Sequence, residues 1–175
     1  MNYFEIFGLD QTFILDIKQL TERFQTIQKS VHPDRFTQAS SQEQLLAVKK
    51  STAVNDAYET LKNPIKRAEY ILSLRGVELP NEQMTFSDNM FLMRQMELRE
   101  MLAEVKFADD IDAAIFEANQ VLDTEFQQLF KAMQASLEAD TPSANKDAGE
   151  NLRKLKFYQK LHLELDRLED LLFDD

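Results

Sequence analysis

Apolar side chains recur every three or four positions along most of the chain, which is the spacing of one buried face on an α-helix. No segment shows the sustained alternation of apolar and polar residues that predicts a half-buried strand. Proline and glycine mark the predicted helix ends, because proline lacks a backbone N–H and glycine suits the residue after a helix. The first half therefore predicts four helices, over about 3–7, 20–31, 42–61 and 64–75.

The second half predicts three longer helices and a loop of small residues before the last of them. The helices are expected over about 87–106, 109–139 and 150–173, and the loop over 139–149. Ser87 is a plausible N-cap for the first of the three. Three helices with short connections favour an antiparallel bundle.

A domain boundary is expected in the polar stretch GVELPNEQ, where Gly76 and Pro80 fall close together. This boundary divides the chain into a domain over 1–75, a linker over 76–83 and a helical bundle over 84–175. The fold class that the pattern predicts is therefore all-α with two domains.

Charge is shared unequally between the two halves. Residues 1–76 carry 10 Lys and Arg against 9 Asp and Glu, whereas residues 77–175 carry 10 against 22. This asymmetry indicates two domains with different partners. The acidic half would repel phosphate backbones, so we do not expect nucleic acid binding.

Other features of the sequence narrow the class of protein. The chain has no cysteine, which excludes disulfides, thiolate zinc sites and iron–sulfur clusters held by cysteine. No apolar run approaches 18 residues, so no membrane span is expected. The opening MNYFEIFG lacks the pattern of a signal or transit peptide. We therefore expect a cytoplasmic protein.

The tripeptide His32-Pro33-Asp34 stands between two predicted helices of the first domain. Pro33 ends the first helix, and a polar turn between two helices forms the exposed tip of a hairpin. His32 and Asp34 would thus be presented on either side of a rigid proline. Taken alone, the tripeptide also fits an ordinary surface histidine near a helix end.

The order of motifs around this tripeptide resembles the J-domain of DnaJ-type co-chaperones. The matching segments are NYFEIFGLD at the start, HPDRF at 32–36 and NDAYETLKNPIKRAEY at 55–70. The resemblance covers about residues 1–75 and implies docking on a DnaK-type chaperone with stimulation of its ATP hydrolysis. In this role Asp34 would accept hydrogen bonds from a chaperone arginine, Pro33 would hold Asp34 in place and His32 would fix the loop.

Cations around the tripeptide would steer the domain toward an acidic chaperone surface. They are Lys18, Lys29 and Arg35. The polar face of the second helix, with Gln25, Thr26 and Gln28, is less basic than in many J-domains, which suggests modest affinity or a dedicated chaperone. A Gly/Phe-rich segment and a CxxCxGxG module are both absent, which disfavours a general DnaJ-type holdase.

The segment 87–106 carries apolar residues on two faces of its predicted helix. One stripe contains Phe91, Leu98, Leu102 and Val105, and the opposite side contains Leu92, Met93 and Met96. A three-helix bundle needs one buried stripe per helix, so the second group is either packed inside the molecule or exposed among glutamates as a partner site. The positions of these residues around the predicted helix leave both alternatives open.

The whole chain resembles the HscB family, J-type co-chaperones dedicated to iron–sulfur cluster assembly. The matching segments are RAEYILSLRGVEL at 67–79, FLMRQMELRE at 91–100 and NLRKLKFYQKL at 151–161. The resemblance implies an L-shaped adaptor between an HscA-like chaperone and an IscU-like scaffold protein. Its scaffold-binding residues would be Leu92, Met93, Met96, Glu97, Glu100, Glu104 and Phe157.

Nothing in the sequence indicates an enzyme, a metal site or a bound cofactor. The two histidines, His32 and His162, lie far apart, and no phosphate-binding loop or nucleophile–base pair is visible. The acidic pair Asp109-Asp110 sits at a predicted helix start, where it favours the helix dipole. The alternative function that stays open is a J-domain adaptor that delivers other clients to a DnaK-type chaperone.

Overall fold

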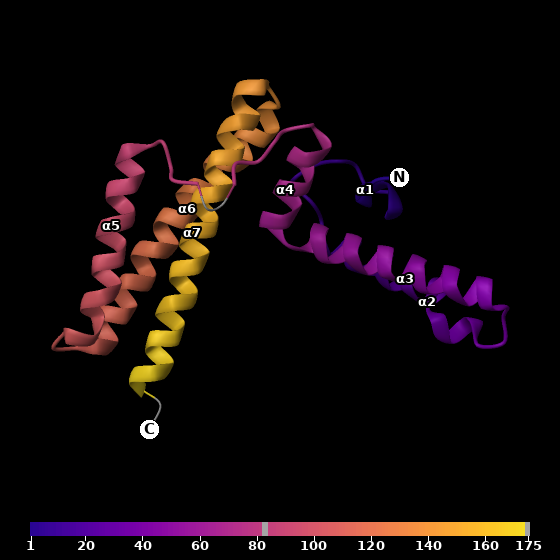
Figure 1. Ribbon diagram of the computed structural model, residues 1–175, viewed down its shortest axis with the longest axis horizontal. Helices are drawn as coiled ribbons and strands as arrows, with labels where there is room; N and C mark the ends of the chain where they lie inside the picture. Colours follow the sequence, from indigo (N-terminus) through magenta and orange to yellow (C-terminus); the bar gives the residue numbers. More distant parts are fainter. Residues whose placement is uncertain (82–83, 174–175) are drawn as a thin grey trace. The chain divides into compact units, whose positions relative to one another are not determined.

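The computed structural model describes residues 1–81 and 84–173, and all regular structure in those ranges is helical (Figure 1). The predicted all-α fold class is therefore confirmed. The chain forms two compact units, Met1–Glu78 and Leu79–Asp175. Their boundary falls inside the stretch 76–83 where the sequence places the linker, and residues 82–83 lie outside the described residues. The L-shaped arrangement of the two units stays a prediction.

The first unit is a helical hairpin with two flanking helices. Its elements are α1 (Tyr3–Ile6), α2 (Ile17–Val31), the 3₁₀ turn η1 (Pro33–Phe36), α3 (Ser41–Lys62) and α4 (Pro64–Leu74). Helices α2 and α3 lie side by side, joined by η1 at the tip (Figure 1). The core gathers apolar side chains from every helix, including Phe4, Leu20, Leu61 and Ile71.

Arg67 is a buried cation that ties the first unit together. Its Nε donates to the carbonyl of Phe13 at 2.8 Å, and its Nη1 donates to the carbonyl of Leu61 at 2.7 Å. The guanidinium also lies over the Phe13 ring, 4.8 Å from the centroid. Burial lowers the pKa of Arg67 below its usual value. A side chain from α4 thus donates to two backbone carbonyls and links α4 to α3 and to the segment before α2.

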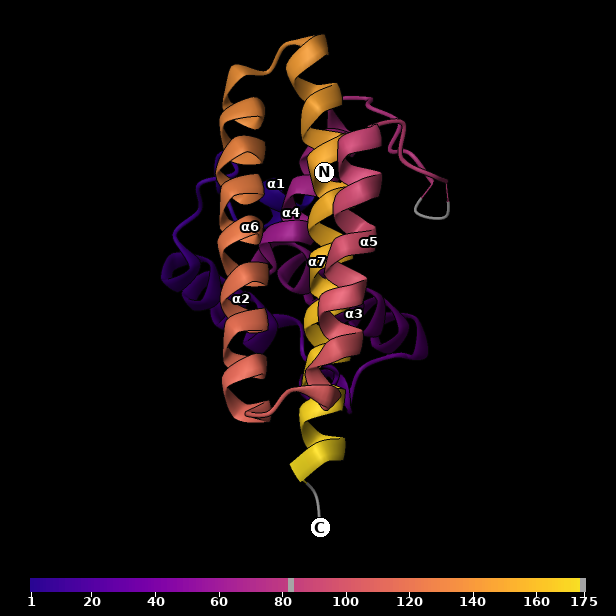
Figure 2. The same cartoon turned by 90° about the vertical axis from the view of Figure 1, so that its left-hand side faces the viewer.

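The second unit is a three-helix bundle. Its elements are α5 (Asn89–Glu104), the 3₁₀ turn η2 (Val105–Phe107), α6 (Ile111–Ala139) and α7 (Pro142–Phe173). The three helices run alongside one another (Figure 2), and α6 and α7 form the most extensive pair. Helix α5 joins this pair through large side chains, Phe91, Leu98 and Leu102, which are buried in the bundle core. Because bulky side chains separate the α5 backbone from α6 and α7, an open groove runs along each side of α5.

The prediction of a loop over 139–149 is wrong, because α7 begins at Pro142. Asp140 ends α6 in the left-handed conformation, with φ of 46°. The hydroxyl of Thr141 then accepts a hydrogen bond from the backbone N–H of Ala144 at 3.0 Å, as an N-cap does. Proline is well suited to the first turn of a helix, where its missing N–H has no partner to lose. The connection is therefore two residues long.

Small residues misled the loop prediction because they form a packing surface. Ala148 and Gly149 are buried, and a Cβ added to Gly149 would meet the Leu79 side chain at 3.4 Å. The N-cap of α5 also differs from the predicted Ser87. It is Asp88, whose carboxylate accepts from the backbone N–H of Phe91 at 3.2 Å. No helix in the described ranges is long and apolar enough to cross a membrane.

Candidate functional site

The tip of the α2–α3 hairpin is a short, ordered turn. Pro33 opens η1, and His32 caps it by accepting a hydrogen bond from the backbone N–H of Asp34 on Nδ1 at 3.2 Å. The Asp34 side chain is 88% exposed. The sequence predicts an irregular loop here, whereas the structure forms a 3₁₀ turn that points the carboxylate into solvent. Asp34 is therefore open to a partner.

His32 has two mutually exclusive ways of holding this turn. Its Nδ1 lies 3.2 Å from the Asp34 backbone nitrogen and 3.5 Å from the Asp34 carboxylate. A neutral ring accepts from the backbone N–H on Nδ1, whereas a protonated ring carries a proton on Nδ1 and pairs with the carboxylate. In both states the contact stays between His32 and Asp34, so His32 fixes the turn as expected from its position.

Arg35 also contributes to the stability of the tip. Its Nη1 donates to the carbonyl of Lys29 at 3.1 Å, which satisfies one of the unpaired carbonyls at the C-terminal end of α2. Its own backbone N–H donates to the carbonyl of His32 at 3.0 Å. Arg35 is exposed as well, so a residue expected to steer a partner also holds the turn.

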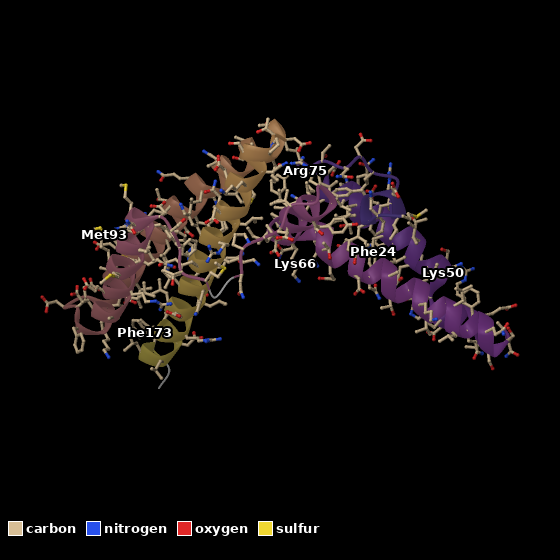
Figure 3. All side chains as sticks on the ribbon, turned by 45° about the horizontal axis from the view of Figure 1, so that its top comes forward. Phe24, Lys50, Lys66, Arg75, Met93 and Phe173 are labelled. Carbon is tan, nitrogen blue, oxygen red and sulfur yellow. The ribbon has the colours of Figure 1, made fainter. Side chains whose placement is uncertain are left out.

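A shallow groove of about 560 Å³ runs beside the tip along α2. It is lined by Phe24, Gln25, Gln28, Lys29, His32 and Arg35. Phe24 (labelled in Figure 3) stacks on Tyr58 of α3, with ring centroids 4.0 Å apart. Gln28 is held by Ser51 and Asn55 through its amide nitrogen, at 3.2 and 3.0 Å. The polar face of α2 is therefore fixed in place by α3.

Lys18 and Lys29 are both exposed on α2. They are eleven residues apart, which is close to three helical turns, so both lie on one face about 16 Å from each other. Lys29 lines the groove beside the tip, and Lys18 lies at the far end of the same face. Of the predicted chaperone-binding set, Lys29, His32 and Arg35 line the groove, Pro33 and Asp34 belong to the turn at its end, and Lys18 lies in the first turn of α2.

The second apolar face of α5 divides into exposed and half-buried parts. Met93 and Met96 are 64% and 68% exposed, and the Met93 side chain projects away from the bundle core (Figure 3). Leu92 is half-buried and packs against the core cluster. The two alternatives for this face therefore apply to different residues, because the methionines are exposed while Leu92 also supports the core.

Glutamates border the methionines on the side of α5 that faces α6. Glu97, Glu100 and Glu104 are all exposed and line a groove of about 780 Å³ between α5 and α6. Glu97 also accepts from Arg94 at 2.7 Å. Phe107 of η2 lines the same groove with 78% of its surface exposed. Sequence reasoning missed Phe107, because its exposure depends on the 3₁₀ turn that follows α5.

Phe157 of α7 borders the opposite flank of α5. It is half-buried and meets Phe91 edge to face, with centroids 5.8 Å apart. A second groove, of about 940 Å³, brings Phe157 together with Leu92, Met96 and Glu100. Met93, Glu97 and Glu104 do not line this groove. The predicted scaffold-binding residues of α5 (Leu92, Met93, Met96, Glu97, Glu100 and Glu104) therefore form a crest with one groove on each side, and Phe157 of α7 lines the second groove.

Two family models match the two units of the chain. One, described as the DnaJ domain, matches residues 2–70, and the other, described as the HSCB C-terminal oligomerisation domain, matches residues 87–166. A co-chaperone protein HscB homolog from Colwellia psychrerythraea is 57% identical over 175 residues, which is 100% of both chains. One from Aeromonas hydrophila is 47% identical over 174 residues, which is 99% of both. The chain belongs to the HscB family.

Solved structures of the HscB family have the same fold. The chaperone HscB from Vibrio cholerae matches with a TM-score of 0.93 and 43% identity, over 98% of this chain and 100% of that one. The human co-chaperone protein HscB matches with a TM-score of 0.88 and 31% identity, over 97% of this chain and 82% of that one. The fold described above is thus that of the HscB family.

HscB proteins are co-chaperones in iron–sulfur cluster assembly, and the family is not one of enzymes. The J-domain implies a partner of the DnaK-type chaperone class. In the described ranges 1–81 and 84–173, no group of three or more His, Asp or Glu side chains is placed to hold a metal ion.

Three side-chain pairs hold the α5 crest in this HscB chain, and sequence reasoning missed all of them. Arg94 binds both carboxylate oxygens of Glu125 on α6, at 2.7 and 3.0 Å. Lys154 of α7 binds Asp88 at 3.0 Å, and Arg99 binds Glu164 of α7 at 2.8 Å. The hydrogen bonds that Arg94 donates to Glu125 and Glu97 raise the pKa of Arg94 above its usual value.

Proposed function

We propose that this HscB-family chain docks on a specialised, HscA-type chaperone of the DnaK class and delivers an IscU-type iron–sulfur scaffold protein to it in the cytoplasm. One observation carries the proposal. The same chain presents an exposed carboxylate on an ordered tip in one unit, and exposed methionines among glutamates on α5 in the other. Two accessible sites of different chemistry on separate units are what an adaptor between two proteins requires.

On the chaperone side, the proposed binding residues are Lys18, Lys29, His32, Pro33, Asp34 and Arg35. The Asp34 carboxylate accepts charge-assisted hydrogen bonds from a chaperone arginine, and such bonds are about twice as strong as neutral ones. The turn is already held by His32 and Arg35, so little conformational freedom is lost when it binds. Lys18 and Lys29 accelerate the encounter with an acidic surface.

On the scaffold side, the proposed binding residues are Leu92, Met93, Met96, Glu97, Glu100, Glu104 and Phe157. Methionine side chains adapt to the shape of a partner, so the centre of the crest supplies apolar contact area. The glutamates along one side select a partner with basic residues opposite them. The proposal therefore expects a scaffold surface with an apolar centre and a basic border.

The experiment that tests this function measures ATP turnover by an HscA-type chaperone with the chain alone, with the scaffold alone and with both. The chain alone should raise turnover, and both together should raise it by more than the sum of the separate effects. Equal stimulation with and without the scaffold would still support the action of the J-domain on the chaperone, but it would contradict delivery of this scaffold. The alternative that the J-domain delivers another client would then stand.

A further inference from the structure

The two grooves that flank the α5 crest carry opposite charge. The groove toward α6 is lined by Glu97, Glu100, Glu104 and Glu117 and by no cation. The groove toward α7 is lined by Arg99, Arg153, Lys156 and Lys160, with Glu100 as the single carboxylate. Four of the 10 Lys and Arg residues of the acidic second half therefore line one groove. Such clustering is unexpected for a surface whose net charge is strongly negative.

The cations of the α7 groove come from one face of one helix. Arg153, Lys156 and Lys160 follow one another at spacings of three and four residues, so their side chains project along the same flank of α7. Phe157 lies on this stripe as well, and Arg99 of α5 faces it, with its guanidinium 5.7 Å from the Phe157 centroid. Apolar and cationic side chains therefore alternate along the groove.

These cations are neutralised to different degrees. Arg153 is 8% exposed, lies over the Phe86 ring and is 3.6 Å from Glu150. Arg99 binds Glu164 at 2.8 Å and keeps 47% of its side chain exposed. Lys160 is exposed and makes no ion pair with the residues that the structure describes. The groove thus carries positive charge that faces solvent at Lys160, whereas the Arg153 cation is buried against Phe86.

We propose that the α5–α7 groove receives an acidic side chain of the scaffold protein, directly beside the apolar group that packs on Met96 and Phe157. The inference rests on the proposed function, because it names a further part of the same binding site. Lys160, together with the exposed part of Arg99, supplies the positive charge for an aspartate or glutamate carboxylate. The apolar walls, formed by Phe86, Leu92, Met96 and Phe157, require an apolar neighbour for that carboxylate, as an amphipathic protein segment provides.

The opposite signs of the two grooves also set the orientation of the scaffold on α5. In one orientation, a carboxylate of the scaffold meets Lys160 of α7 and a cation of the scaffold meets the glutamates toward α6. Turned by half a revolution about the crest, the same scaffold would place like charges against each other on both flanks, which disfavours binding. A uniformly acidic crest would not make this distinction.

The test is a charge reversal in the full chain, Lys160→Glu, with an IscU-type scaffold protein as the probe. Calorimetry gives the dissociation constant at low and high salt. We expect about tenfold weaker binding at low salt and a smaller difference at high salt, because exposed charges are screened. The matched control is Lys131→Glu, a single reversal of an exposed lysine of α6 that lines neither groove, and it should bind the scaffold within twofold of the parent.

Met96→Ala separates failure of this inference from failure of the proposed function. If Met96→Ala weakens binding but the lysine reversal leaves it unchanged or tighter, the carboxylate site is wrong and the scaffold function stands. If neither variant changes binding, the scaffold surface itself is wrong, and the carboxylate site fails with it. Sedimentation adds a further check, because self-association of the parent that the reversal abolishes, with scaffold binding unchanged, would mean that a second copy of the chain occupies the groove.

Discussion

The contacts that hold the tip of the α2–α3 hairpin join residues close together in the sequence, whereas those that hold the crest of α5 join residues far apart in it. At the tip, His32 contacts a residue two positions away and Arg35 contacts one six positions away. At the crest, Arg94 pairs with a residue 31 positions away, and Lys154 and Asp88 are 66 positions apart. The tip is therefore built almost entirely from one short segment, whereas the crest depends on the packing of the whole bundle.

Because of this difference, variants at the tip and at the crest should affect binding and stability differently. A change at the tip should affect the contact with the chaperone and leave folding intact, because the Asp34 side chain is 88% exposed and its carboxylate lies beside His32 of the same turn. A change near the crest can act through stability as well as through contact, because α5 is anchored by distant partners. Variants at the two sites therefore need different controls.

Asp34→Asn should have the largest effect of the variants considered. The amide keeps the size of the side chain but loses the charge, and charge-assisted hydrogen bonds contribute roughly 1.5–3 kcal/mol each. Stimulation of the ATPase of an HscA-type chaperone should therefore fall by about tenfold or more. The thermal midpoint of the variant should equal that of the parent.

The matched control for Asp34→Asn is Asp10→Asn, which changes another exposed aspartate of the same unit. It should stimulate the chaperone as the parent does. Full stimulation by Asp34→Asn would show that the tip does not act through its charge, and a fall in its thermal midpoint would show that the tip is not independent of the fold.

The double variant Met93→Ala with Met96→Ala should have the next largest effect. Both side chains are mostly exposed, so their loss removes apolar contact area for the scaffold while the core keeps its packing. We expect scaffold binding, measured by calorimetry, to weaken about tenfold or more, and stimulation of the chaperone in the absence of scaffold to stay at the parent level. Leu92 is left unchanged because it also packs against the core.

Met90→Ala is the control for the methionine pair, since Met90 is 82% exposed on the same helix but lies outside the proposed surface. It should bind the scaffold as the parent does. Equal losses from Met90→Ala and from the pair would indicate a general effect of methionine on α5, and the crest would no longer be a distinct site.

The range of the contacts also explains what the sequence could predict. The tip could be predicted from the sequence because Pro33 and its neighbours act on adjacent residues. The α5 stripe could be predicted because helical periodicity is local. The pairing of Arg94 with Glu125 could not be predicted, since many glutamates on α6 and α7 are equivalent before the bundle is assembled. The start of α7 was missed for a related reason, because Ala148 and Gly149 resemble loop residues until the surface that they pack against is known.

Arg94→Ala tests whether the crest depends on its distant anchors. The Arg94 and Glu125 side chains are 38% and 24% exposed, so solvent screens their ion pair in part, and we expect a loss of about 1 kcal/mol in the free energy of unfolding. Denaturant unfolding measures this loss. Arg167→Ala, which removes an exposed arginine from α7, should leave stability within experimental error. Equal stabilities for the two variants would mean that the bidentate pair does not anchor α5.

The smallest expected effect is a pH dependence at the start of α5. The hydrogen bond from Lys154 and that from the backbone N–H of Phe91 lower the pKa of Asp88 below its ordinary value of 3.8. A carboxyl whose pKa is lowered in the folded state stabilises that state above its unfolded pKa, and this contribution disappears as the pH falls through the folded pKa.

Asp88→Asn should therefore be less stable than the parent at pH 7, and the difference should shrink as the pH is lowered below about 4. The amide oxygen still accepts the hydrogen bond from Phe91, so the variant isolates the charge from the helix cap. Denaturant unfolding of both proteins across this range gives the difference directly. A difference that stays constant with pH would mean that Asp88 holds α5 as a neutral cap, and that its pairing with Lys154 adds nothing to the anchoring of the crest.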